Sequence, residues 1–147
     1  MSSANPDKQR LRLWLRLLKA SRYMEAALRE RMRTVFDTTL PRFDVLAMLH
    51  KSGEGLTMSA LSKALMVSNG NVTGLIDRLE AEGAVQRLSV AGDRRAARVA
   101  LTEQGRLDFE RMAAIHEQWV AELLSELSDA EITQVSDVLA RIKGDRA

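Results

Sequence analysis

Apolar residues recur at helical spacing along most of this chain and predict four helices in its first half. The first runs from about residue 8 to 33, the second from about 41 to 52, and two short helices follow, the later one over 69–82. The first helix carries apolar side chains on more than one face: Leu11, Leu13, Trp14, Leu15, Leu17 and Leu18. Because so small a domain has little spare interior, we expect a partner subunit to cover one of these faces.

The two short helices have well-marked beginnings. Thr57 precedes the first and Ser68 precedes the second, and both residue types cap a helix by accepting a hydrogen bond from its first turn. Asn69-Gly70 is also typical of a two-residue hairpin turn. The apolar residues after it keep a helical period through Leu79, however, so the pattern favours a helix.

From residue 84 onward the apolar positions alternate, which is typical of strands. Two such stretches, 84–90 and 96–101, are separated by the turn residues Ala91-Gly92-Asp93 and predict a β-hairpin. Four arginines lie in or beside this hairpin: Arg87, Arg94, Arg95 and Arg98. Asp93 is the only acid among them, so the predicted hairpin is basic.

Two more helices complete the chain, from Thr102 to about residue 126 and from Ser128 to about 143, where Ser128 and Glu131 form a capping box. The order of elements is that of a winged helix-turn-helix. We therefore predict a single domain over 1–147, mainly α with a small β-hairpin wing. Its segments are a winged helix-turn-helix over 41–101, a recognition helix over about 69–82, a wing over about 84–101, and long flanking dimerisation helices over 8–35 and 102–144.

The chain has 147 residues and no cysteine, which excludes disulfides, thiolate metal sites and thiol redox switches. We find neither a signal peptide nor an apolar run of about 20 residues, so we expect a cytoplasmic protein without a membrane partner. Residues 1–40 carry nine Lys or Arg against four Asp or Glu, whereas residues 103–147 carry five against ten. This uneven charge suits a polyanionic partner, although a solvated charged surface explains it equally well.

The start of the 69–82 helix is rich in small polar residues that can reach base edges or phosphates in a major groove. The wing arginines can reach a minor groove, and Asp93 is close enough to Arg95 to fix its guanidinium with a charge-assisted hydrogen bond. The alternatives are an exposed, well-capped helix start and a hairpin that its arginines keep soluble. Because both features occur in tandem, the pattern favours binding of duplex DNA.

Three stretches resemble the MarR (multiple antibiotic resistance regulator) family: LTMSALSKAL from Leu56, VSNGNVTGLIDRLEAEG from Val67 and DRRAARVALTEQG from Asp93. The resemblance covers nearly the whole chain. It implies a transcriptional regulator that is an obligate homodimer, formed by the first helix and the last two. Its two winged domains would bind a pseudo-palindromic operator in double-stranded DNA.

The resemblance also implies roles for individual residues. Asp93 and Arg95 would lie in the minor groove, residues 68–73 would face the major groove, and Arg78 would contact a phosphate. The full set of expected DNA contacts is Thr57, Ser59, Ser68, Asn69, Gly70, Asn71, Thr73, Arg78, Asp93, Arg94, Arg95 and Arg98.

Members of this family often repress until a small, usually aromatic, acid or its thioester binds between the dimer helices and the winged domain. Here that cleft would lie between the 8–33, 41–52 and 102–126 helices. Mapping and side-chain chemistry give the candidates Trp14, Arg16, Ser21, Arg22, Phe43 and His116. Arg16 or Arg22 could meet a carboxylate or phosphate. The alternative is that the aromatic residues among them are simply core and interface residues.

Two other classes of function are alternatives to a DNA-binding regulator. An enzyme is disfavoured, because the two histidines, His50 and His116, lie in different helices and no phosphate-binding loop or nucleophile motif is present. A winged-helix module that binds protein and not DNA is the runner-up, since fold alone does not decide function. We expect no cofactor and no metal, and a diffusible organic effector such as an aromatic acid or its coenzyme A thioester.

Overall fold

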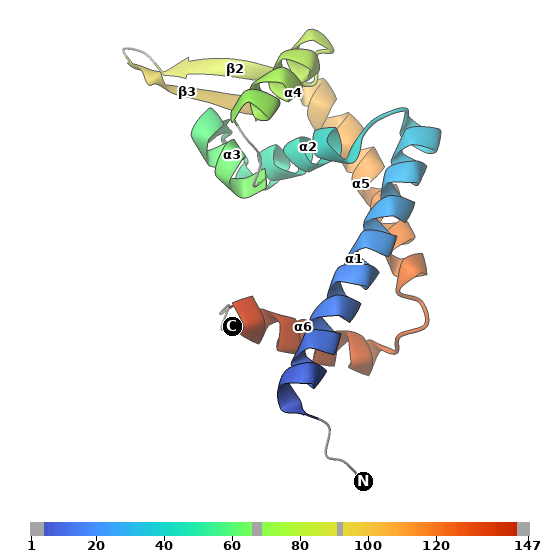
Figure 1. Cartoon of the computed structure of the whole chain (residues 1–147). Helices are drawn as coiled ribbons and strands as arrows, with labels where there is room; N and C mark the ends of the chain where they lie inside the picture. Colours follow the sequence, from blue (N-terminus) through green and yellow to red (C-terminus); the bar gives the residue numbers. More distant parts are fainter. Residues whose placement is uncertain (1–4, 66–68, 91–92, 144–147) are drawn as a thin grey trace.

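The computed structural model describes residues 5–65, 69–90 and 93–143, and it shows a mainly helical chain with one small antiparallel sheet (Figure 1). Its elements, in chain order, are α1 (Pro6–Phe36), α2 (Leu40–Ser52), β1 (Leu56–Thr57), α3 (Met58–Leu65), α4 (Asn69–Ala81), β2 (Val85–Val90), β3 (Asp93–Leu101), α5 (Glu103–Leu123) and α6 (Asp129–Lys143). The predicted fold class, a winged helix-turn-helix with long flanking helices, is confirmed, and so is the helix at Asn69-Gly70.

α3 and α6 begin directly after their predicted capping residues. Oγ1 of Thr57 accepts a hydrogen bond from the backbone N–H of Ala60 at 3.1 Å. The Ser128 hydroxyl accepts from the N–H of Glu131 at 3.2 Å, and the Glu131 carboxylate accepts from the N–H of Ser128 at 3.0 Å. The predicted cap Ser68 lies outside the described residues.

Several boundaries differ from the prediction. α1 extends beyond 8–33 at both ends, because Asn5 caps it and apolar residues continue the helical pattern to Phe36. α5 ends at Leu123, since the chain must turn before the capping box that opens α6. The hairpin turn is also tighter than predicted: Val90 already pairs with Asp93.

The strand β1 is absent from the sequence-based prediction. It pairs Leu56 with Val99 and Thr57 with Arg98 on β3, which gives the sheet order β1-β3-β2. Two residues are too few to show an alternating pattern, and their partner strand lies far along the chain. The turn before α3 is thereby fastened to the base of the wing.

The hydrophobic core lies within the winged part, between the helices and the sheet. Eight side chains are almost completely buried there or against it: Met32, Val45, Leu61, Val72, Ile76, Leu79, Val85 and Val99. Burying one such side chain contributes about 1.5–3 kcal/mol to folding. Phe109 and Trp119 extend the core along α5 toward α1, where Trp119 packs on Phe36.

A tight junction joins α5 to the winged part. The Thr102 hydroxyl donates to the Gly83 carbonyl at 2.6 Å and also caps α5 by accepting from the Gly105 N–H at 3.0 Å. Gly105 packs directly on the backbone of Ala84, where any β-carbon would collide with the Ala84 carbonyl. The start of α5 therefore cannot move independently of the sheet.

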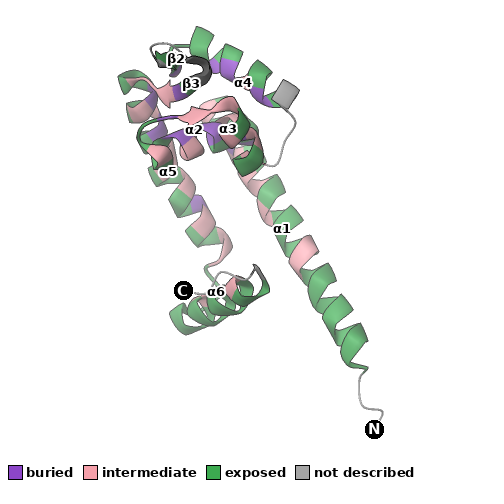
Figure 2. Ribbon diagram, turned by 90° about the vertical axis from the view of Figure 1, so that its left-hand side faces the viewer, coloured by how far each residue is buried: buried purple, intermediate pink, exposed green. Residues whose placement is uncertain are grey.

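The outer halves of α1 and α6 are mostly exposed (Figure 2). Large apolar side chains there lie in solvent, among them Trp14, which is 56% exposed, and Ile142, which is 65% exposed. In Figure 2, α6 lies apart from α1 and exposes nearly its whole length. No helix in the described part of the chain is long and apolar enough to cross a lipid bilayer.

Candidate nucleic-acid interface and ligand cavities

The helix α4 has one buried and one exposed face. Val72 and Ile76 are fully buried, while the positions Asn71, Gly74 and Arg78, spaced three and four residues apart, are exposed. Because the apolar spacing fixes the rotation of the helix, these three positions share the outward face. Asn71 and Thr73, two of the predicted DNA contacts, both lie exposed in the first turns of α4.

The predicted contacts nearer the base of the wing take part in local structure. The hydroxyl oxygen of Thr57 caps α3, and the following Ser59 is exposed. Arg98 donates from Nη1 to the carbonyl of Gly55 at 3.3 Å. This bond ties β3 to the turn before β1, while Arg98 as a whole residue is exposed.

Arg87 forms ion pairs within the fold that the sequence pattern does not predict. Its guanidinium donates to Asp77 and to Glu80, both at 2.6 Å, and so links β2 to the exposed side of α4. The hydrogen bond that Arg87 donates to Asp77 is the main cause that raises the pKa of Arg87, and Glu80 adds to it. Of the hairpin arginines, Arg87 is therefore one that holds the wing against the helix.

The remaining predicted contacts fall at the edges of the described structure. Ser68 lies outside it. The backbone of Asn69 and Gly70 belongs to α4, and that of Asp93, Arg94 and Arg95 belongs to β3, but their side chains lie outside the described part. In Figure 1, α4 and the β2–β3 hairpin lie side by side at the end of the molecule opposite the N-terminus.

This arrangement matches known proteins. The sequence model of the MarR family matches residues 38–97, which span α2, both short helices and most of the hairpin. A MarR family transcriptional regulator from Silicibacter pomeroyi is 31% identical, and its crystal structure matches 95% of this chain and 96% of that chain with a TM-score of 0.77. The chain belongs to the MarR family.

Two other relatives connect this fold with transcription and with DNA. PecS of Dickeya dadantii (strain 3937), an HTH-type transcriptional regulator, is 33% identical over 103 residues; these are 69% of this chain but only 62% of PecS. The S. aureus MepR–DNA complex is 25% identical with a TM-score of 0.73, and the match covers 91% of this chain and 96% of that chain. MarR family members are transcriptional regulators and not enzymes, which agrees with the expectation from the sequence.

The six ligand candidates of the MarR resemblance separate in the structure. Ser21 and His116 border a common cavity of about 390 Å³ between α1, the start of α2 and α5. Phe43 is buried beside it, with its ring centroid 4.7 Å from that of His116. The other three candidates are exposed on α1 and do not border this cavity: Trp14, Arg16 and Arg22.

Two of the titratable groups that border the smaller cavity, Asp44 and His116, have shifted pKa values. Burial is the main cause that raises the pKa of the Asp44 carboxyl and lowers the pKa of the His116 imidazole, and each group partly offsets the shift of the other. His116 is therefore neutral at pH 7 and can both donate and accept a hydrogen bond. Asp44 is not among the residues predicted from the sequence, although its position directly after the apolar Phe43 is a signal that points to it.

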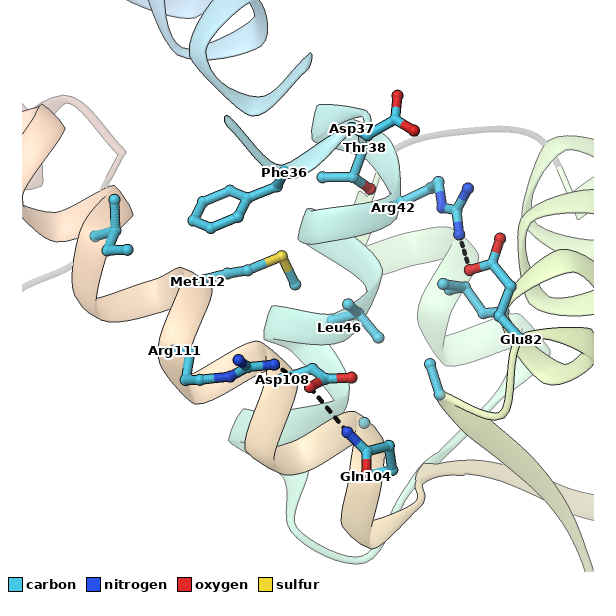
Figure 3. Close-up of a pocket in the computed structure, with 14 residues that line it drawn as sticks. Phe36, Asp37, Thr38, Arg42, Leu46, Glu82, Gln104, Asp108, Arg111 and Met112 are labelled. Carbon is cyan, nitrogen blue, oxygen red and sulfur yellow. Dashed lines mark hydrogen bonds and ion pairs between the residues drawn. The ribbon is translucent and has the colours of Figure 1, made fainter. Parts of the chain in front are cut away.

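A larger cavity, of about 620 Å³, lies on another side of α2 (Figure 3). It is bordered by the ends of α1 and α4, by α2 and by α5, and by none of the six candidates. Arg42 of α2 and Glu82, which follows α4, form an ion pair at its edge. These residues are far apart in the sequence, and no motif connects them.

Proposed function

We propose that this chain is a DNA-binding transcriptional regulator that acts as a homodimer. The observation that carries the proposal is the outward polar face of α4 beside the basic hairpin, in a chain of the MarR family. Burial of Val72 and Ile76 fixes this face, and the Arg87 clamp fixes the hairpin beside it. The MepR–DNA complex supports the same use of the fold.

The dimensions of α4 suit the major groove of B-form DNA. A helix of 13 residues is about 20 Å long, and the groove is about 12 Å wide. We place Asn71 and Thr73 toward the base edges and Arg78 toward a phosphate. Arg95, with Asp93 to orient it, would enter the neighbouring minor groove from the hairpin.

The exposed apolar side chains of α1 and α6 support the homodimer. A second copy of this chain would cover them, because its own α1 and α6 present the same unpaired apolar faces. Two winged domains held in this way would read two half-sites about one helical turn apart, and hence a pseudo-palindromic operator.

We also propose that the regulator is a repressor released by a small aromatic acid or its coenzyme A thioester. Both cavities lie where the long helices meet the winged part, so a ligand in either can change the position of α4 relative to the dimer. Ser21 and neutral His116 are the predicted residues that face such a ligand in the smaller cavity.

Fluorescence anisotropy on duplex DNA from immediately upstream of the protein's own gene tests the DNA proposal. We expect tight binding that weakens with salt and exceeds binding to a scrambled duplex. Arg95→Ala should cost about 1–3 kcal/mol and flatten sequence preference at the wing position. If neither this duplex nor a wider DNA library is bound selectively, the fold acts here as a protein-binding module.

A further inference from the structure

The corner between α4 and β2 is closed by backbone hydrogen bonds. The N–H of Gly83 donates to the Glu80 carbonyl at 3.0 Å. The N–H of Ala84 donates to the Leu79 carbonyl at 2.9 Å. Beyond this corner, β2 runs beside α4 (Figure 1). The angle between this strand and the helix therefore decides where the outer end of the hairpin lies relative to α4.

Arg87 lies past the corner and reaches back across it to α4. Its Nη2 donates to Asp77 and its Nη1 to Glu80, both at 2.6 Å. Its backbone N–H also donates to the second oxygen of Glu80 at 3.3 Å. Asp77 and Glu80 are three residues apart on the helix, so the planar guanidinium meets α4 at two points about one turn apart. Because these donors form a rigid fork, the Arg87 clamp, made of these three side chains, restrains the angle between β2 and α4.

The clamp holds the hairpin just inside the place where its strand pairing becomes irregular. Regular pairing with β3 extends from Val85 to Leu88, and the register shifts between Leu88 and Val90. Arg87 belongs to the regular stretch, and Val85, two residues before it, is buried in the core. The clamp thus fixes the part of the hairpin from which the wing, with the predicted minor-groove contact Arg95, extends.

The guanidinium of Arg87 is occupied within the fold. Both of its terminal nitrogens are paired with α4, and Arg87 is not among the predicted DNA contacts. Asp77 is 60% exposed and Glu80 42%, and ion pairs at such exposed positions contribute little to folding stability. The core therefore does not depend on the clamp. What depends on it is the direction of the hairpin.

We propose that Arg87 is a positioning residue for DNA recognition, which holds the hairpin at the angle to α4 that lets the helix occupy a major groove while the wing enters the neighbouring minor groove. This role rests on the proposed function, since it concerns how the two proposed DNA contacts are made together. Without the clamp the hairpin samples more directions and must lose this freedom on binding, so the wing adds less affinity. Arg87 thereby raises sequence selectivity through Arg95 and not through a contact of its own.

A double-mutant cycle between Arg87 and Arg95 tests this role. Fluorescence anisotropy measures how far Arg95→Ala weakens binding of the selectively bound duplex, in the unsubstituted chain and in Arg87→Gln. We expect a loss of about tenfold in the unsubstituted chain. In Arg87→Gln we expect a loss of no more than about twofold, because the wing already contributes little there. A merely structural role of Arg87 would not change this cost, since a lower folded fraction affects both members of each pair alike.

A second variant separates position from charge. Arg87→Gln removes one positive charge, whereas Asp77→Asn combined with Glu80→Gln removes two negative charges and breaks the same ion pairs. Binding of a scrambled duplex should therefore weaken in the first variant and strengthen in the second, because this binding follows charge. In both variants we expect the cost of Arg95→Ala to fall to about twofold or less, because both lack the clamp.

Arg106 provides the matched control. It also joins two carboxylates, Glu103 at 2.6 Å and Glu110 at 3.0 Å, but all three residues belong to α5. Arg106→Gln removes one positive charge, as Arg87→Gln does, and should leave the cost of Arg95→Ala at its full value. Circular dichroism verifies that each variant is folded.

Other outcomes overturn the inference. If Arg95→Ala keeps its full cost in Arg87→Gln, the clamp does not position the wing, while the DNA proposal stands. A cost that falls in Arg87→Gln but not in the Asp77 and Glu80 variant, or that falls equally in Arg106→Gln, would assign the effect to charge. If Arg95→Ala costs nothing in the unsubstituted chain, the proposed wing contact is wrong, and the positioning role is rejected with it.

Discussion

Two regions of the molecule differ in how far their apolar side chains are buried. One is the winged part, from α2 to β3, and the other is the outer halves of α1 and α6. In the winged part these residues meet in one core, with Leu61 and Ile76 fully buried. On the outer helices, residues of the same types lie in solvent: Leu11 is 55% exposed and Ile142 65%. Thr102 and Gly105 join the start of α5 firmly to the winged part.

This contrast shows which part of the fold is complete within one chain. Covering one large apolar side chain contributes about 1.5–3 kcal/mol, and association costs about 4–15 kcal/mol of lost freedom. Several exposed residues on two helices are enough to exceed that cost once a second copy covers them. The winged part buries its apolar core without a second copy of the chain. The polar face of α4 therefore stays available for DNA.

The largest expected effect is on the free energy of unfolding, when isoleucine is replaced by alanine in the winged part. The same replacement on α6 is the comparison. Ile76→Ala should lower the free energy of unfolding by about 2–5 kcal/mol, because it opens a cavity in the core. Ile142→Ala should change it by no more than about 0.5 kcal/mol at protein concentrations too low for association. Urea denaturation at a low and a high protein concentration measures both. Equal losses at both concentrations for Ile142→Ala would show that α6 packs within its own subunit.

A charge on α6 should weaken the proposed homodimer. Val138 is 41% exposed, and Val138→Asp would place an unpaired carboxylate in the proposed interface. Since a desolvated unpaired charge costs several kcal/mol, we expect self-association to weaken by at least about tenfold in analytical ultracentrifugation. Asp137→Asn, on the same turn, is the control and should change it little. An unaffected dimer in Val138→Asp would mean that another surface joins the subunits.

The features predicted from the sequence are those that local patterns encode. Thr57, Thr102 and the Ser128–Glu131 pair mark helix starts through bonds to residues three positions away, so their effect is visible in the sequence itself. The apolar period after Asn69-Gly70 likewise decided for a helix, because burial of Val72 and Ile76 on one side requires it.

The features that escaped prediction depend on residues distant in the sequence. β1 exists only through its pairing with β3, and Arg87 pairs with α4 because the fold brings Asp77 and Glu80 to it. The Arg42–Glu82 pair is of the same kind. Local periodicity cannot reveal such contacts. Mapping onto the family does not reveal them either: of the six ligand candidates, two border the smaller cavity, Phe43 is buried beside it, and three are exposed.

A smaller effect is expected at Gly74, on the outward face of α4. An added β-carbon would have no neighbour within 4 Å there, so Gly74→Ala should stabilise the fold by about 0.5–1 kcal/mol through helix propensity. If the backbone at this position approaches DNA closely, the same variant should bind operator more weakly. Thermal unfolding and anisotropy measure the two effects, with Gly105→Ala as the opposite control because it collides with Ala84. Unchanged DNA affinity would show that Gly74 does not lie at the DNA surface.

The smallest expected effect is the pH dependence of stability at His116, between the two regions. Burial lowers the pKa of His116 below its usual value of about 6.5. As pH falls below that value, the unfolded chain takes up a proton that the folded chain resists, so the free energy of unfolding falls between about pH 7 and pH 5. His116→Gln should flatten this fall in urea denaturation. Asp44, whose raised pKa acts in the opposite direction, provides the comparison: Asp44→Asn should leave the fall in place or make it steeper. An unchanged slope in His116→Gln would show that the long helices and the winged part enclose this ring too loosely to resist its protonation.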